Sequence, residues 1–289
     1  MLKKIFKNYY NEIIDIINTE IPKKRKYKIS NEYCLEKIYE ILKTGISWNN
    51  LYTINCHYSS IYKRFKYWVK LNIFNKIWNY ILQEYTNKQK LKNILHFKTL
   101  FIDSTMVRNH LGFNCIGRNY QDRFRNATKI SVICDNNKIP LCALYYPATV
   151  HDSTTIEDSL NALNNKFNLK DKRYHSTLVA DKGYIIDKEK KNNLINNFKT
   201  KLLTPSRRKS EKQKKKENKK DEKNKKQSKK QIKKSDKYLL SIRYKIENVF
   251  NRLDQYKRIR YREDRLINTF IAFNQFAMTS IIIIFLNNK

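Results

Sequence analysis

The sequence predicts an α/β protein in which a mixed five-stranded sheet flanked by helices follows a small all-α region. Up to about residue 95, apolar residues recur at steps of three and four, as amphipathic helices require. Beyond that point, short runs of β-favouring residues alternate with helical patterns. Two of these runs lead into an isolated carboxylate, at Asp103 and at Asp181. The second region is therefore where we expect a functional site.

The first region, residues 1–95, is predicted to hold four short helices. Ser30 is a suitable N-cap for the second helix, and Gly45 suits the position just after its end. The apolar stripes that define the four helices lie within residues 2–17, 34–42, 61–69 and 74–85.

Several basic side chains are expected on the exposed side of the third predicted helix: Lys63, Arg64, Lys66 and Lys70. A short helix with such a face could enter a DNA groove in a helix-turn-helix arrangement. An ordinary helical bundle with a solvated basic face explains the pattern equally well, because periodicity alone does not reveal helix-turn-helix geometry.

The second region, residues 96–289, reads as a three-stranded antiparallel meander followed by alternating helices and strands. A polar loop is expected over 112–126, between the first two strands. A capping box at Thr154 and Glu157 is expected to begin the first helix after the meander. The expected elements are strands at 99–102, 128–134 and 139–146, a helix at 156–167, a strand at 177–180, a helix at 188–197, a strand at 199–204, and helices from about residue 237.

A lysine-rich segment, residues 206–237, interrupts this region with 17 Lys or Arg against 5 Asp or Glu, a net charge of +12. It has too little apolar surface to fold by itself, so we expect it to be disordered. A flexible DNA-gripping or nuclear-import arm is one interpretation. A lysine-rich linker with nonspecific DNA affinity is the interpretation we favour.

The whole chain of 289 residues carries a formal net charge of +35. Such a basic surface favours a polyanionic partner, above all nucleic acid. A membrane surface is the competing partner, and a biased genome composition could supply part of the lysine, since Lys, Asn, Ile and Tyr are abundant while Gly and Pro number only four each. The charge supports nucleic-acid binding without proving it.

The five cysteines form no C-x-x-C pair, which indicates neither a disulfide framework nor a zinc site and fits a reduced intracellular protein. Residues 2–17 alternate apolar and charged residues, unlike a signal peptide. The apolar run at 281–286 is too short to span a bilayer. We therefore expect no membrane partner.

Three acids stand in apolar surroundings: Asp103, Asp181 and Glu247. A carboxylate in such a place costs free energy unless it has a partner. Taken alone, Asp103 is more often a hydrogen-bonded turn or strand-end residue than a catalyst, and Glu247 is expected on a helix. Taken together, the three acids suggest a shared metal ion, since hard cations such as Mg²⁺ bind carboxylate oxygen.

The chain resembles insertion-sequence transposases of the DDE class, whose catalytic domain has the RNase H-like fold and follows a helical N-terminal domain. The resemblance runs from about residue 21 to the C-terminus, and the order of its motifs is more specific than any one of them. The motifs are IDST at Asp103, GRNYQDRFRNATKIS at 117–131, the His151–Asp152 pair, ADKGY at Asp181, and RYKIENVF with RLDQYKRIRYREDR from Arg243.

The resemblance implies that Asp103 bridges two Mg²⁺ ions, for which Mn²⁺ can substitute, while Asp181 and Glu247 hold one ion each. It also implies DNA-phosphate contacts near the metals. Candidates for these contacts are Arg118, Lys129, His151, Lys182, Arg243 and Lys257.

Two of these candidates have a structural alternative. His151 is as readily explained as a hydrogen-bonded structural histidine, and Arg243 as an ion pair with Glu247 one helical turn away. Many relatives carry a tyrosine seven residues before the glutamate and a lysine seven after it. Leu240 and Asp254 stand there in this chain, with Lys257 one turn further on, which puts the family's phosphate contacts in question.

Three hypotheses follow. The first is an insertion-sequence transposase that binds terminal inverted repeats of double-stranded DNA, cuts them with Mg²⁺, and joins the 3′-hydroxyl to target DNA, acting as a homodimer. The second is an RNase H-like nuclease that cuts without joining. The third is an inactive or domesticated DNA-binding protein.

Overall fold

The computed structural model describes residues 2–22, 28–54, 56–91, 97–169, 175–205 and 234–288. Most of the lysine-rich segment, residues 206–233, lies outside the described residues. The final four residues of that segment belong to a helix that begins at Lys234.

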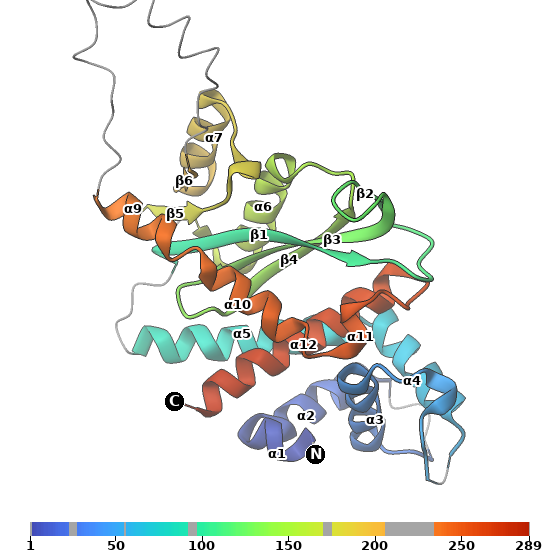
Figure 1. Ribbon diagram of the computed structural model, residues 1–289. Helices are drawn as coiled ribbons and strands as arrows, with labels where there is room; N and C mark the ends of the chain where they lie inside the picture. The colour runs from blue at the N-terminus through green and yellow to red at the C-terminus, as the bar shows by residue number, and fades with distance from the viewer. Residues whose placement is uncertain are drawn as a thin grey trace, which may run out of the picture.

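A mixed sheet with helices on its faces forms the centre of the molecule (Figure 1). β3 lies antiparallel between β1 and β4, while β5 runs parallel to β1 and β6 parallel to β5. This order and these directions are those of an RNase H-like sheet, which confirms the predicted fold class. The strands are β1 Thr99–Arg108, β2 Gly117–Asn119, β3 Arg125–Asp135, β4 Pro140–Pro147, β5 Ser176–Val179 and β6 Thr200–Leu203.

The sheet departs from the predicted one at two places. β2 is a short sixth strand inside the expected polar loop, and it forms by pairing with the start of β3. β1 continues through Asp103 to Arg108, because its second half also pairs with β3. Asp103 therefore sits in the middle of a strand, opposite Val132, and not at a strand end.

Three of the four predicted N-terminal helices begin and end close to their predicted limits, whereas the first, predicted over 2–17, is divided into two helices by a 3₁₀ turn, η1 (Lys7–Tyr9). The helices of this region are α1 Leu2–Phe6, α2 Tyr10–Glu20, α3 Asn31–Thr44, α4 Tyr58–Lys70 and α5 Ile73–Leu91. Ser30 accepts a hydrogen bond from the backbone N–H of Tyr33, and Gly45 adopts a left-handed conformation with φ of 72°, so both predicted caps of α3 are confirmed. Arg64 is not on the exposed face of α4: it is buried and donates to Asn31 and to the carbonyl of Ile29.

The remaining helices are α6 Thr155–Phe167, α7 Lys188–Phe198, α9 Lys234–Ser241, α10 Tyr244–Leu253, α11 Lys257–Arg260 and α12 Ile267–Asn287. The predicted capping box before α6 is wrong, because Thr154 caps nothing with its side chain and instead donates to the carbonyl of His151. A short 3₁₀ turn, η3 (Asp152–Thr154), precedes α6 and changes its start.

α12 joins the N-terminal helices to the sheet. It packs mainly against α5 and also contacts α1, α3, α4, α10 and β4, as the lower half of Figure 1 shows. By length and composition α12 could cross a membrane, but 78% of its apolar window is buried inside the protein. The predicted regions 1–95 and 96–289 thus share one hydrophobic core, and the boundary between them stays a prediction.

Candidate functional site

Asp103 is the residue on which the candidate site is built. Its Oδ1 accepts from the backbone N–H of Ser104 at 2.9 Å, and its Oδ2 accepts from Arg243 Nη1 at 2.9 Å. Burial raises the pKa of Asp103; the Ser104 N–H and Arg243 oppose this rise, while the charges of Asp181 and Asp152 add to it. The carboxyl is thus held in a cluster of acids whose repulsion one arginine offsets.

Arg243 connects two of the predicted acids. Besides Asp103, it donates through Nη2 to Glu247 Oε1 at 3.0 Å, which confirms the expected ion pair one helical turn apart. The Arg243 and Asp103 side chains are 24% and 21% exposed, whereas Glu247 is 53% exposed. Arg243 therefore lies between the strand acid and the helix acid.

The parallel pairing of β1 and β5 brings Asp181 close to Asp103. Phe101 pairs with Val179, so Asp103 and Asp181 each lie two residues beyond a paired position. Neighbouring strands are roughly 4.8 Å apart, which places the two acids side by side at the carboxyl end of β5. Asp181 is exposed and precedes a 3₁₀ turn, η5 (Lys182–Tyr184).

A fourth acid, Asp152, also belongs to the site and was not among the predicted site residues. Its Oδ1 accepts from Ser104 Oγ and from Lys129 Nζ, each at 2.7 Å. A Cβ placed on Gly183 would lie 3.1 Å from Asp152 Oδ2. The absence of a side chain at Gly183 therefore allows Asp152 to lie close to the backbone of η5. Asp152 thereby connects β1, β3 and η5. The sequence signal that could have identified it as a site residue was the His151–Asp152 pair among the motifs.

The predicted phosphate-binding residues are not all brought together. Lys129 is only 2% exposed and its ammonium donates to Asp152 and to the Val150 carbonyl, which argues against a direct DNA contact and assigns it to holding Asp152. Arg118 and Lys182 are exposed, on β2 and η5.

His151 and Lys257 have different surroundings. His151 is exposed, and its Nδ1 bonds Ser153 Oγ at 2.8 Å and accepts from the Ser153 N–H at 3.2 Å; this agrees with the structural alternative. Lys257 begins α11, where its Cβ lies against Gly45 at the end of α3. The Cβ of Lys257 therefore lies against the N-terminal helices.

Among the described residues, no group of three or more His, Cys, Asp and Glu side chains is arranged to hold a metal ion. The chemistry of the donors nevertheless suits a hard cation: Asp181 and Asp152 are close enough to Asp103 for their charges to act on it. A cation, the Arg243 guanidinium, already contacts two of the predicted ligands.

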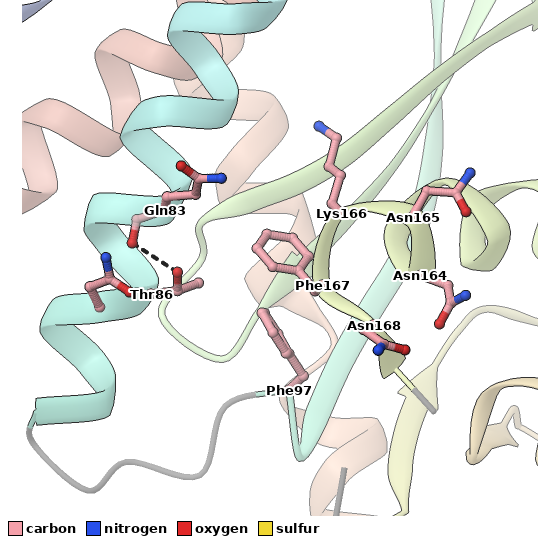
Figure 2. A pocket seen from close by; sticks show the side chains of 9 residues that line it. Gln83, Thr86, Phe97, Asn164, Asn165, Lys166, Phe167 and Asn168 are labelled. Atoms are coloured by element: carbon pink, nitrogen blue, oxygen red, sulfur yellow. Dashed lines mark hydrogen bonds between the residues drawn. The ribbon is translucent and has the colours of Figure 1, made fainter. Parts of the chain in front are cut away.

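A pocket between α5 and α6 lies apart from these acids (Figure 2). Lys166 at its rim has a pKa lowered to about 8 by burial, and its ammonium lies 3.6 Å from the centre of the Trp78 ring. No carboxylate lines this pocket, so it adds nothing to a metal-dependent site. Its lining residues are Gln83, Thr86, Asn87, Phe97, Asn164, Asn165, Lys166, Phe167 and Asn168.

Comparison with known proteins found similarity to transposases. A family model described as "Transposase DDE domain" matches residues 96–285, and no curated protein matches the chain. A piggyBac transposase synaptic complex with hairpin DNA has 13% sequence identity and a TM-score of 0.37, over 73% of this chain and 51% of that one. A Mos1 transposase paired-end complex with the left transposon end has 12% identity and a TM-score of 0.27, over 84% of each chain. The present chain spans about half the length of the piggyBac protein.

Proposed function

Because this chain belongs to the family of transposase DDE domains, we propose that it is an insertion-sequence transposase. In this proposal it binds the terminal inverted repeats of its element, cleaves DNA there with Mg²⁺, and joins the 3′-hydroxyl to target DNA. The observation that carries the proposal is the Arg243 guanidinium, which bonds Asp103 on β1 and Glu247 on α10 at once.

Asp103, Asp181 and Glu247 would hold two Mg²⁺ ions, which Mn²⁺ can replace. Bound there, the ions would neutralise charge on the attacking and leaving oxygens of a phosphodiester. In the described structure Arg243 is ion-paired with two of these three carboxylates, and its single positive charge offsets one of their two negative charges. In this proposal the ions would compete with Arg243 for these carboxylates, and a displaced guanidinium would face the phosphate of a bound DNA strand.

DNA would be held by exposed basic side chains on both halves of the molecule. Lys182 lies beside Asp181, and Arg118 lies on β2. On α4, Lys63, Lys66 and Lys70 are exposed and provide the face with which the N-terminal helices would bind the element's ends. We further propose that two chains act together, each on one end.

Cleavage and strand transfer on DNA carrying the gene's own flanking ends tests the proposal. Wild-type protein is expected to give Mg²⁺-dependent cuts and joined products, and Asp181→Asn to give neither. Asp187→Asn is the matched control, because Asp187 is an exposed aspartate whose Oδ1 caps α7 by accepting from the Lys190 N–H. Equal activity of wild type and Asp181→Asn would contradict the proposal.

Two further outcomes identify the other hypotheses. Nicking without joined products would indicate an RNase H-like nuclease. Binding without cleavage by wild-type protein in both Mg²⁺ and Mn²⁺ would indicate a DNA-binding protein that has lost catalysis.

A further inference from the structure

The hairpin formed by β2 and β3 presents two aromatic rings to solvent. We call its turn, residues 120–124, the β2–β3 tip. Tyr120 is 68% exposed and Phe124 is 58% exposed. The two rings contact each other edge to face, with centroids 5.3 Å apart and an interplanar angle of 81°. Large exposed aromatic groups in such a pair indicate a binding surface more than a folding requirement.

The backbone of the tip adopts a left-handed conformation at two residues, one of which is the exposed Phe124. Arg123 and Phe124 have φ of 50° and 59°, which is the left-handed region and is strained for an L-residue with a Cβ. Buried Asn119 holds the turn: its carbonyl accepts from Asp122 and Phe124, and its side chain accepts from Gln121. Strained backbone of this kind concentrates at functional sites.

The charges around the tip select a negatively charged partner. Asp122, the only acid in residues 117–125, lies 3.0 Å from Arg108 and 3.9 Å from Arg125, so its charge is neutralised locally. Arg118 and Arg123 are exposed beside the two rings. Flat apolar groups next to arginines match nucleic acid, in which bases stack on aromatic rings and phosphates bind guanidinium groups.

We propose that the β2–β3 tip binds DNA bases directly, with Tyr120 and Phe124 stacking on bases that have left the duplex stack and arginines on the adjacent phosphates. This proposal rests on the proposed function in one respect, that the substrate is DNA. It assigns to the tip a base contact separate from the carboxylate site.

The strand register gives the position of this contact. Asp103 pairs with Val132, seven residues along β3 from Arg125 at the base of the tip. At about 3.3 Å per residue the tip lies roughly 23 Å from Asp103 along the strand. If the bound duplex lies along β3, as the proposal takes it to do, about 3.4 Å per nucleotide step makes that distance roughly seven base pairs from the phosphate at the acids.

The test uses duplexes of the flanking ends with 2-aminopurine placed at successive positions on either side of the cut. Full-length wild-type protein is expected to raise the fluorescence near the seventh position. Tyr120→Ala with Phe124→Ala should abolish that rise and weaken binding to a single-stranded oligothymidine roughly 10-fold or more. Tyr238→Ala, which removes another exposed aromatic ring on α9, should behave as wild type.

A second double variant separates stacking from ordinary apolar contact. Tyr120→Leu with Phe124→Leu keeps bulk at the tip but removes the flat rings, so it should lose the fluorescence signal as the alanine variant does. A leucine variant that retains the wild-type signal would overturn the proposal. So would a change in oligomeric state of the alanine variant by mass photometry, since that would assign the tip to a second copy of the chain.

These readouts distinguish the tip from the proposed function. Wild-type protein that raises the fluorescence but cuts no DNA would support the tip proposal and contradict transposase activity. Wild-type protein that cuts and joins DNA without any tip-dependent fluorescence change would support transposase activity and contradict the tip proposal.

Discussion

Arg243 Nη1 lies 2.9 Å from Asp103 Oδ2, although the two residues are 140 positions apart in the sequence. The contact brings the start of α10 onto the middle of β1 and places a positive charge between two of the three predicted metal ligands. The same arginine lowers the pKa of Asp103 against the effect of burial. It therefore affects both the geometry of the site and the protonation of its central acid.

Replacing Arg243 with glutamine is expected to raise the pKa of Asp103 further. Metal binding needs the carboxylate form, which is lost as the pH falls through that pKa. The acid limb of Mg²⁺-dependent cleavage should therefore move to higher pH in Arg243→Gln. A pH–rate profile measures the shift, with Arg252→Gln on the same helix as the control. An acid limb that stays in place would show that Arg243 does not act on Asp103.

Asp152→Asn is expected to reduce cleavage roughly 10- to 100-fold, the usual effect of losing a partner that positions metal ligands. The variant keeps the shape of the side chain but weakens the bonds from Ser104 and Lys129. Because the Asp152 charge raises the pKa of Asp103, the acid limb should also move to lower pH, the opposite of Arg243→Gln. Asp158→Asn, at an exposed aspartate on α6, is the control. If Asp152→Asn lost activity without a shift of the acid limb, Asp152 would have a purely structural role.

Asp264→Ala is expected to lower the free energy of unfolding by about 3–5 kcal/mol, because it leaves Arg258 buried without its counter-charge. The two side chains are 2.9 Å apart and only 6–7% exposed. Urea denaturation measures the loss. Arg258→Met combined with Asp264→Leu should recover most of it. Glu263→Ala, which removes an exposed pair with His110, is the control and should cost under about 1 kcal/mol. An equal loss of stability in Asp264→Ala and Glu263→Ala would contradict the stabilising role of the buried pair.

Gly45→Ala should destabilise the contact between α3 and α11 by at least about 1 kcal/mol, since a left-handed residue with a Cβ is strained. The new Cβ would also lie 2.9 Å from Lys257 Cβ. Thermal unfolding measures the effect, and Ser47→Ala, at a serine whose side chain makes no cap bond, is the control. Unchanged stability in Gly45→Ala would mean that α11 moves away without cost.

The elements near the site were largely predictable because their signals are local. Alternating apolar residues marked β3, the turn after it marked the start of β4, three- and four-residue spacing marked the helices, and Ser30 and Gly45 marked the ends of α3. β2 was missed because only its pairing with β3 makes it a strand. The capping box at Thr154 was wrong because His151 and Asp152 start a different turn first.

The site was only partly predictable for a related reason. Spacing along one helix was enough to predict the bond between Arg243 and Glu247. It could not predict that Arg243 also reaches Asp103, that Asp152 joins the acids, or that Lys129 and Arg64 are buried. Each of those facts depends on strand register and on the packing of segments far apart in the chain.

The sequence by itself determined the type and order of the elements and the candidate acids, since local backbone preference and the periodicity of apolar residues are properties of neighbouring residues. Tertiary structure alone decided that Asp103 lies in the middle of β1, that α12 forms a core shared with the N-terminal helices, and that Arg243 stands between two acids. The physical reason is that burial and charge pairing depend on distances in space, which sequence separation does not record.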